Sequence, residues 1–318
     1  MKEIGGYFSL ELSQIDNCPQ TDGVMVNSGR NALELVLRSI PRLSKVYIPY
    51  FTCDVVLEPF KKLSVPYTFY RLNTLLELED EISLEEGEYI LYTNYYGVKD
   101  TYVAFLEKNY QGRLIVDNAQ ALYASPTSKC IYSPRKFVGI PDGGIAYTDF
   151  LADNLSFEMD YSYDRCSHLL IRHDKGASEG YLPFKENSSK LKNLPIRKMS
   201  SLTCSLMSSI DFKDVKRKRI LNFEYLHYHL GNSNRLPIDA FGKFECPLVY
   251  PYYTDDTLLK QHLISNKVFV ATYWPNVLDW CTEDMAEFQM AQNIIAIPID
   301  QRYGIEDMNR IIEIIKAK

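Results

Sequence analysis

The sequence predicts an α/β protein with a mostly parallel sheet, helices on both faces, and a smaller C-terminal α/β domain. Short apolar runs alternate with helical patterns through the first half, as expected when a crossover helix follows each strand. Polar residues follow several of these runs, at positions that meet at one edge of a parallel sheet. The 318 residues, 46% of them hydrophobic, suffice for a large domain over residues 1–210 and a small domain over 211–318.

The first half alternates strands and helices. Ser28 is a suitable N-cap for a helix to about Ile40, because a serine side chain accepts a hydrogen bond from the first helical turn. Leu33, Val36 and Leu37 recur at helical spacing in that segment, which gives it one apolar face. The other predicted strands are residues 46–48, 67–70, 89–93, 113–116, 131–132 and 144–147, and the other predicted helices are 54–63 and 101–110.

The second half begins with a weaker pattern. Residues 175–192 are polar and rich in Gly, Ser, Lys and Asn, which predicts a long surface excursion and a candidate lid or dimer contact. Helical spacing starts near residue 200, is interrupted near Ile210 and Asp211, and continues over 215–230. The remaining predicted strands are 247–250, 268–271 and 294–297, and the remaining predicted helices are 257–264, 283–291 and 305–315.

Composition excludes several classes of function. The net charge of −6 gives no global basic field for nucleic acid, and the basic run at 216–219 is expected to be a solvated helix face. Seven scattered cysteines without a CxxC pair indicate reduced thiols, and the five histidines show no HExxH spacing, so no metal site is predicted. No apolar run approaches the length of a membrane span, and no signal peptide is evident. A cytoplasmic protein is expected.

The most informative segment is the one that contains Lys136. It follows a predicted strand and precedes Asp142-Gly143-Gly144, a turn that glycine makes easily. Asp117 comes just past another predicted strand. A lysine and an aspartate at strand ends suit pyridoxal phosphate, because the lysine amine binds the cofactor aldehyde and the aspartate keeps the ring nitrogen protonated. The alternatives are an exposed loop lysine and an aspartate that caps a helix starting at Asn118.

Two further features bear on this site. Ser28, Gly29, Arg30 and Asn31 open a helix, where free backbone N–H groups suit a phosphate, although an ordinary capped helix has the same pattern. Tyr132 and Lys136 also form a YxxxK spacing, which short-chain dehydrogenases use. That alternative needs a glycine-rich dinucleotide loop, which the sequence lacks, and Pro134 interrupts the helix that it requires.

Taken together, these segments resemble the DegT/DnrJ/EryC1/StrS family of sugar aminotransferases over most of the chain. The resemblance implies the aspartate-aminotransferase-like fold of pyridoxal-phosphate-dependent transferases. The matching segments are Asn27-Ser28-Gly29-Arg30-Asn31-Ala32-Leu33, Ile48-Pro49-Tyr50-Phe51-Thr52, Tyr95-Tyr96-Gly97, Asp117-Asn118-Ala119-Gln120-Ala121, Pro134-Arg135-Lys136 with Asp142-Gly143-Gly144, and Ile297-Pro298 with Glu306-Asp307-Met308.

The resemblance implies roles for individual residues. Lys136 would carry the cofactor and move the proton, and Asp117 would bind the pyridine nitrogen. The cofactor-binding set would be completed by Ser28, Gly29, Arg30, Asn31, Cys53, Asn94, Tyr95 and Gln120. The family further implies a homodimer, glutamate as amino donor, and a keto-sugar nucleotide as acceptor in surface polysaccharide synthesis.

The chain departs from the family pattern at several positions. Arg30 replaces the threonine of the phosphate loop, Cys53 occupies the place of a stacking aromatic residue, and Ile131 replaces a phosphate-binding serine. A stacking role for Tyr95 and a phosphate-binding role for Arg30 are therefore open. Two other functions also remain open: a binding or regulatory protein that has lost transamination, and a pyridoxal-phosphate enzyme that acts on a small amino acid.

Overall fold

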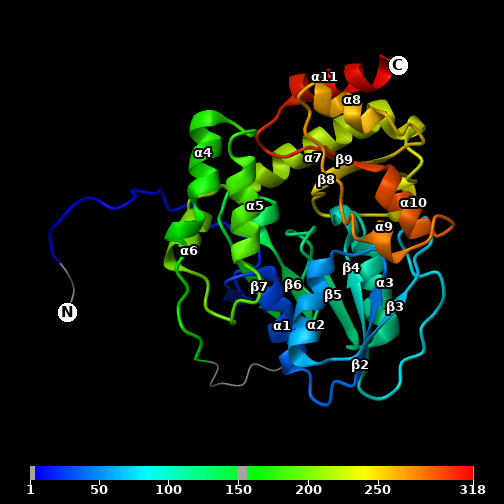
Figure 1. Cartoon of the computed structure of the whole chain (residues 1–318), viewed down its shortest axis with the longest axis horizontal. Helices are drawn as coiled ribbons and strands as arrows, with labels where there is room; N and C mark the ends of the chain where they lie inside the picture. The colour runs from blue at the N-terminus through cyan, green and yellow to red at the C-terminus, as the bar shows by residue number, and fades with distance from the viewer. Residues whose placement is uncertain (1–3, 149–155, 318) are drawn as a thin grey trace.

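The computed structural model describes residues 4–148 and 156–317. A seven-stranded sheet organises the first half, with strand order β1-β7-β6-β5-β4-β2-β3 (Figure 1). The pairings among β2, β3, β4, β5 and β6 are parallel, whereas β7 is antiparallel to β6 and to β1. The strands are β1 (Val24–Val26), β2 (Lys45–Pro49), β3 (Tyr67–Tyr70), β4 (Glu88–Thr93), β5 (Leu114–Asn118), β6 (Cys130–Tyr132) and β7 (Gly144–Tyr147).

Both faces of this sheet are buried, which explains its uninterrupted apolar strands. Alternate residues of β5 point to opposite sides, so that Ile115 packs with α1 (Gly29–Ser39) and α2 (Leu57–Leu63), whereas Leu114 and Val116 pack on the other face. That second face is covered by α3 (Asp100–Tyr110) and by residues of the second half. The predicted mostly parallel sheet with helices on both faces is confirmed.

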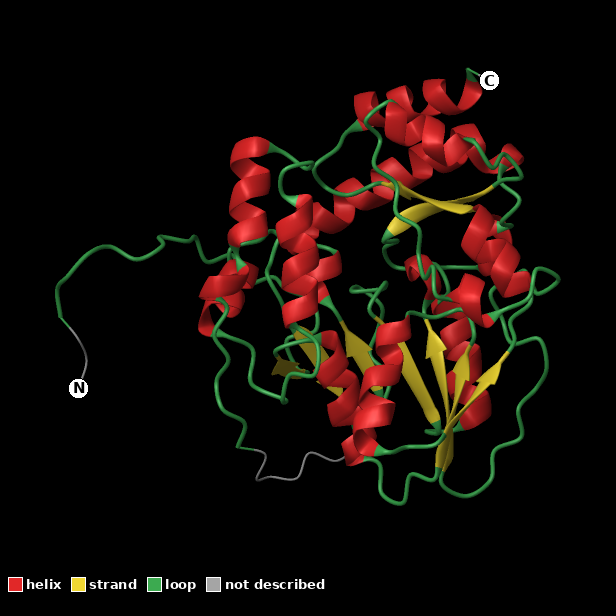
Figure 2. Ribbon diagram, in the orientation of Figure 1, coloured by secondary structure: helices red, strands yellow, loops and turns green. Residues whose placement is uncertain are grey.

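The second half is mainly helical and carries a small antiparallel sheet (Figure 2). β8 (Val249–Tyr253) pairs with β9 (Ile294–Pro298). The long helix α7 starts after Asp211, whose side chain accepts hydrogen bonds from the backbone of Lys213 and Asp214. The helices of this half are α4 (Ser167–Lys175), α5 (Tyr181–Lys190), α6 (Ser201–Ser208), α7 (Phe212–Leu230), α8 (Leu259–Ser265), α9 (Val277–Trp280), α10 (Ala286–Asn293) and α11 (Ile305–Lys316).

Three expectations differ from the structure. Residues 175–192 lie mostly at the surface, as expected, but much of the segment is helical, because it contains the end of α4 and the whole of α5, which pack against each other. The strand expected at 268–271 is reduced to a single bridge between Ala271 and Ala296, since β9 pairs along its length with β8 instead. The basic run at 216–219 is not a solvated face throughout, because Arg219 is only 2% exposed.

The glycine pair after Asp142 is required by close packing. Gly143 has a φ of 106°, and a Cβ on Gly144 would lie 2.2 Å from the backbone oxygen of Ser28. The backbone N–H of Gly143 donates to the oxygen of Asn27 at 3.0 Å. The two glycines thus allow the start of β7 to approach the beginning of α1 directly, which places the loop of Ser28 beside the segment that contains Lys136.

Candidate active site

Lys136 lies on a single 3₁₀ turn, Pro134–Lys136, which follows β6. The turn is closed by hydrogen bonds from the backbone N–H of Lys136 to the oxygen of Ser133, and from Phe137 to Pro134. The Lys136 side chain is exposed in the single chain. Its positive charge nevertheless acts on Asp117 and Cys53, where it opposes the rise in pKa that burial causes in both groups. The structure therefore brings these three predicted residues together.

Asp117 lies within β5, one residue from its end, rather than just past it. It is 7% exposed, and its Oδ1 accepts a hydrogen bond from the backbone N–H of Ala119 at 2.8 Å. Burial raises the pKa of this carboxyl group, and the charge of Lys136 and the Ala119 bond partly oppose the rise. Asp117 does accept a backbone hydrogen bond, as the helix-capping alternative predicts, but the residues that follow it form a turn and not a helix.

Gln120 is fully buried near the same strand ends. Its Oε1 accepts a hydrogen bond from the backbone N–H of Tyr96 at 2.7 Å. Its Nε2 is buried without a hydrogen-bond partner among the residues that the structure describes. Because a buried amide donor normally has an acceptor, this group fits a ligand oxygen.

The beginning of α1 presents Ser28, Gly29 and Arg30 to the same region. Ser28 Oγ accepts a hydrogen bond from the backbone N–H of Asn31 at 3.2 Å, as expected for an N-cap. A Cβ on Gly29 would be 3.4 Å from Ser133, which shows how closely the two loops approach. The Asn31 side chain donates to Asn27 and to the backbone of Pro195. The side-chain amide of Asn31 therefore stabilises the fold and is not available to a ligand.

Two arginines lie next to each other beside these loops. Arg30 Nε is 3.7 Å from Glu58, but its Nη1 is buried without a hydrogen-bond partner within residues 4–148 and 156–317. The pKa of Arg135 is lowered to about 10, mainly by burial and then by the charge of Arg30. Two neighbouring cations in a partly buried place attract an anion. Arg135 was not among the predicted site residues, although it immediately precedes Lys136.

Asn94 and Tyr95 have structural partners. Asn94 Nδ2 donates to Asp100 at 2.6 Å and to Asn118 at 3.1 Å, and no part of its side chain is exposed. The Tyr95 hydroxyl donates to the oxygen of Phe51, and its ring packs edge-on against Trp274. Neither side chain offers a surface to a ligand, so the stacking role considered for Tyr95 lacks structural support.

Cys53 is half-buried, and burial raises the pKa of its thiol. Its Sγ donates to Asp54 Oδ1 at 3.6 Å. The charge of Lys136 acts on this thiol and opposes the rise, so Cys53 lies near the lysine. A small thiol there leaves more space than an aromatic ring would.

The dehydrogenase alternative fails on geometry. Tyr132 is a residue of β6, it is fully buried, and its hydroxyl donates to the backbone oxygen of Ala124 at 3.0 Å. Burial raises the pKa of its hydroxyl. Tyr132 therefore cannot share a helical face with Lys136 or transfer a proton to a substrate.

Other residues that the sequence did not indicate support the lysine loop. On α5, Asn187 donates to the backbone oxygen of Pro141 at 2.8 Å, and Ser188 accepts a hydrogen bond from Arg135 at 3.1 Å. From the other side, Arg219 and Gln301 both donate to the backbone oxygen of Phe137. These contacts join segments far apart in the chain, so only the fold reveals them.

The chain has the fold of the fold-type-I pyridoxal-phosphate aminotransferases, which confirms the predicted fold class. DesV from S. venezuelae, solved with a ketimine intermediate, is 16% identical with a TM-score of 0.64, and the match covers 93% of this chain and 84% of that one. A DegT DnrJ EryC1 StrS aminotransferase from Brucella abortus is 14% identical (TM-score 0.63; 92% and 85% covered). The sugar aminotransferase CalS13 from Micromonospora echinospora is 14% identical (TM-score 0.62; 92% and 86% covered). No protein-family model and no curated protein sequence matches the chain.

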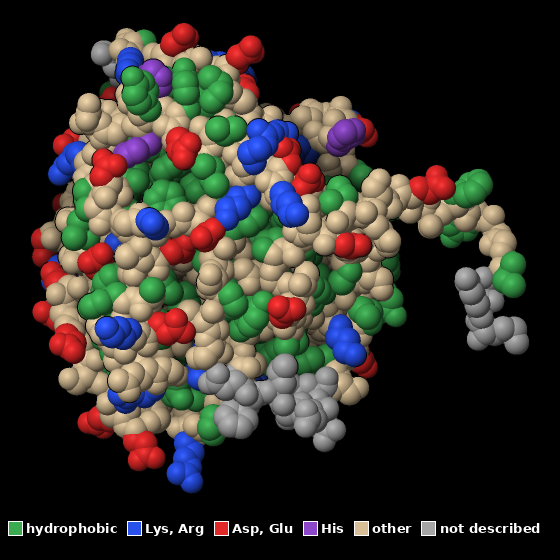
Figure 3. Space-filling model, turned by 180° about the vertical axis from the view of Figure 1, so that it is seen from behind, with side chains coloured by type: hydrophobic (Ala, Val, Ile, Leu, Met, Phe, Trp, Pro, Cys, Tyr) green, Lys and Arg blue, Asp and Glu red, His purple; other side chains and the backbone are tan. Residues whose placement is uncertain are grey.

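Two features of the described residues bear on other functions. Within residues 4–148 and 156–317, no helix combines the length and apolar character that a membrane crossing requires. The same residues contain no cluster of three or more His, Cys, Asp or Glu side chains placed to bind a metal ion. On the face drawn in Figure 3, acidic and basic side chains are interspersed and form no single basic surface.

Proposed function

We propose that this protein is a pyridoxal-phosphate-dependent aminotransferase, which transfers an amino group from glutamate to a nucleotide-linked keto-sugar. The observation that supports the proposal most directly is the placement of Lys136 and the buried Asp117 at the ends of the neighbouring strands β6 and β5, where the charge of the lysine opposes the rise that burial causes in the pKa of the carboxyl group. Ligands of open α/β sheets bind at this carboxyl edge. The similarity in fold to sugar aminotransferases also supports the proposed function.

The residues of the site fit the cofactor. Lys136 would bind the aldehyde carbon, Asp117 the ring nitrogen, and the unpaired Nε2 of Gln120 an oxygen on the ring. Arg30 and Arg135, with the first backbone N–H groups of α1, would bind the phosphate. When bound, the cofactor supplies an electron sink for the reacting carbon.

The protein side chains then have separate tasks. Asp117 holds a proton on the ring nitrogen, and its burial keeps water away from that contact. The amine of Lys136, once neutral, removes and returns a proton on the substrate carbon. Arg30 and Arg135 would hold the phosphate of the cofactor and would thereby orient it.

The assembly that we propose is a homodimer. Lys136 is exposed in the single chain, and a second subunit would enclose it. The N-terminal segment projects away from the body (Figures 1 and 3), and Tyr7 and Phe8 are 98% and 92% exposed. Such exposed aromatic side chains are typical of a segment that packs on another chain. We further propose that the protein acts in the synthesis of a surface polysaccharide and that it is located in the cytoplasm.

Absorbance spectroscopy tests the cofactor directly. Purified protein with added pyridoxal phosphate should gain a visible absorption band, and borohydride should then fix the cofactor to Lys136 in a peptide map. Glutamate should remove the band before reduction. The Lys136→Ala variant should show none of these effects, whereas Lys108→Ala, which removes an exposed lysine of α3, should behave as the wild type. A wild-type protein that stays colourless would contradict the proposal.

A second candidate is a binding or regulatory protein that has lost transamination. It is favoured by the absence of an aromatic residue at Cys53 together with the burial of Tyr95, which leave no evident ring to stack on the cofactor. This candidate predicts that the absorption band forms but that no amino donor removes it. A pyridoxal-phosphate enzyme for a small amino acid would instead lose its band with that amino acid and not with glutamate.

A further inference from the structure

The hairpin of α4 and α5 packs against the side chain of Arg135 on the lysine loop. Arg135 Nη2 donates a hydrogen bond to Ser188 Oγ of α5 at 3.1 Å, and its guanidinium carbon lies 5.6 Å from the centre of the Phe184 ring. Asn187 of the same helix donates to the backbone oxygen of Pro141 at 2.8 Å. The hairpin is therefore attached both to the arginine side chain and to the backbone of the loop.

The positive charge of Arg135 is only partly compensated. Burial and then the charge of Arg30 lower the pKa of Arg135, and the opposite charge of Asp142 raises it by less. Asp142 is itself paired with Arg165 at 2.9 Å. Arg30 Nη1 is buried and lacks a hydrogen-bond partner among the residues that the structure describes. Two cations held this close favour an anion beside them.

His168 of α4 adds a third group that can carry a positive charge. It is 6% exposed, and its ring centre lies 5.7 Å from that of Phe184, the ring that also contacts Arg135. Its Nδ1 is buried without a hydrogen-bond partner in the described part of the chain. Burial and then the charge of Arg135 lower the pKa of the imidazole, and the backbone of Arg165 opposes the fall. His168 is therefore neutral near pH 7 while Arg135 is uncompensated.

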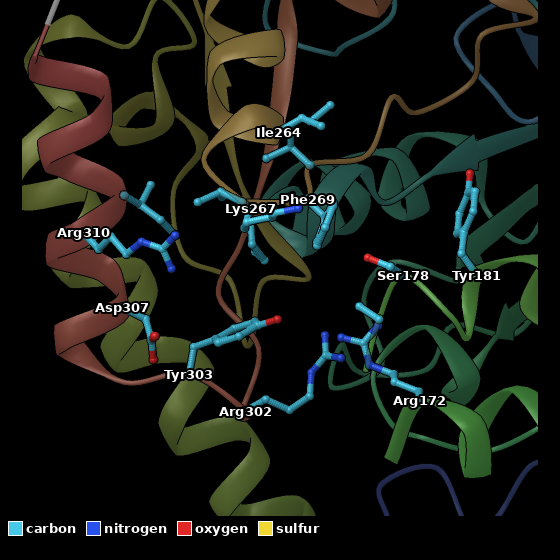
Figure 4. A pocket seen from close by; sticks show the side chains of 15 residues that line it. Arg172, Ser178, Tyr181, Ile264, Lys267, Phe269, Arg302, Tyr303, Asp307 and Arg310 are labelled. Carbon is cyan, nitrogen blue, oxygen red and sulfur yellow. The ribbon is translucent and has the colours of Figure 1, made fainter. Parts of the chain in front are cut away.

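The other elements around His168 direct their charges elsewhere. Among the described residues, Arg135 is the charged side chain whose field acts on the imidazole. Arg172 follows one turn later on α4, and its guanidinium lines the cavity between the hairpin and α11 (Figure 4). Asp164, in the preceding turn, pairs with a lysine of α5 at 3.8 Å. The contact from α5 itself is the uncharged ring of Phe184.

We propose that His168 is a positioning residue of the phosphate site, which acts through Arg135 and takes up a proton when an anion binds to Arg30 and Arg135. A bound anion cancels the field that Arg135 imposes on the imidazole, so the ring can then carry a charge. Because such coupling is reciprocal, the protonated ring also favours the bound anion. The inference rests on the proposed function in one respect, that these two arginines form the phosphate site.

An NMR titration of protein labelled with ¹³C at the histidine Cε1 atoms tests the proposal. Sulfate is the probe, because it stays a dianion over the range in which histidine titrates. The signal of His168 is the one that His168→Gln lacks. Its pKa should rise by at least about half a unit when sulfate is added, and sulfate should bind at least about threefold more tightly at low pH than at high pH. A ring that only filled space would show neither effect.

Three variants separate this coupling from general effects. Arg135→Ala should raise the pKa of His168 without sulfate, because the like charge is gone, and should remove the response to sulfate. This comparison does not depend on the folding of a His168 variant. His168→Gln should bind sulfate with an affinity that no longer changes with pH. His173→Gln, which removes an exposed histidine of the same helix, should behave as the wild type.

The result is distinguishable from that of the cofactor test. If neither sulfate nor pyridoxal phosphate changes the pKa of His168, or if Arg135→Ala does not raise it, the coupling is refuted, even where borohydride fixes the cofactor to Lys136. If the pKa responds to sulfate as described but no cofactor is fixed, His168 and the two arginines still form a proton-linked anion site, and the proposed aminotransferase function fails.

Discussion

Arg219 Nη2 donates a hydrogen bond to the backbone oxygen of Phe137 at 3.0 Å. Arg219 belongs to α7, and Phe137 directly follows Lys136, so a buried side chain of the second half holds the lysine loop in position. The same guanidinium donates through Nη1 to the oxygen of Leu248, at the start of the small sheet. Arg219 thus connects three segments that the sequence places far apart.

Replacement of Arg219 should destabilise the protein. Arg219→Met keeps much of the side-chain volume but leaves the buried oxygens of Phe137 and Leu248 without this donor. We expect the free energy of unfolding to fall by about 2–4 kcal/mol, measured by urea denaturation. Arg217→Met, in the same run but exposed and paired with Asp214, should change it by less than about 1 kcal/mol. Equal losses in the two variants would contradict the role of Arg219.

Gly144→Ala should disturb the approach of β7 to α1. The added Cβ would lie 2.2 Å from the Ser28 oxygen, a distance that only a backbone shift can relieve. We expect a loss of about 2–4 kcal/mol in unfolding free energy and weaker cofactor binding, because Ser28 would move. Gly139→Ala is the control, since its Cβ would meet nothing closer than 3.9 Å. A Gly144→Ala protein with wild-type stability would refute this packing argument.

Arg30 and Arg135 should act on the phosphate of the cofactor and not on its ring. Arg30→Ala and Arg135→Ala should each weaken binding of pyridoxal phosphate about tenfold, and should leave the weak binding of pyridoxal, which has no phosphate, unchanged. Fluorescence titration with both compounds measures this. Arg38→Ala on the same helix, whose guanidinium pairs with Glu34 at 2.6 Å, should affect neither. Equal losses for both compounds would indicate a general distortion of the site.

Asp117 should make stability depend on pH. Burial raises its pKa in the folded protein above the ordinary carboxyl value, so the folded state binds the proton more tightly than the unfolded state. The stabilising effect of that proton is present below the ordinary pKa, near 4, and is lost as pH rises through the folded pKa. Asp117→Asn removes this dependence.

The measurement is the unfolding free energy of both proteins at several pH values from about 4 to 7. The wild type should lose stability relative to Asp117→Asn as pH rises. The variant can still accept the hydrogen bond from Ala119, so it should fold, but its amino transfer should fall at least about hundredfold, because an amide cannot hold the ring nitrogen protonated. A stability difference that is constant with pH would show that Asp117 is not perturbed as described.

Much of the architecture follows from local patterns. The predicted strands at 67–70 and 144–147 match β3 and β7 residue for residue, and the predicted interruption of the helical pattern at Ile210 and Asp211 falls directly before α7. The hydrophobic period and the capping residues are properties of neighbouring residues, so the sequence reveals them. The strand β1 was not predicted, because its three residues give too short a pattern.

The sequence alone determined the alternation of strands and helices, and the placing of Lys136 and Asp117 at strand ends, since both depend on residues close together in the chain. Only the tertiary structure decided that Arg30 and Arg135 are neighbours, that Asn94 and Tyr95 are occupied by structural contacts, and that α5 and Arg219 hold the lysine loop. Those relationships join residues separated by many positions. They depend on which surfaces the whole chain buries together, and no local pattern contains that information.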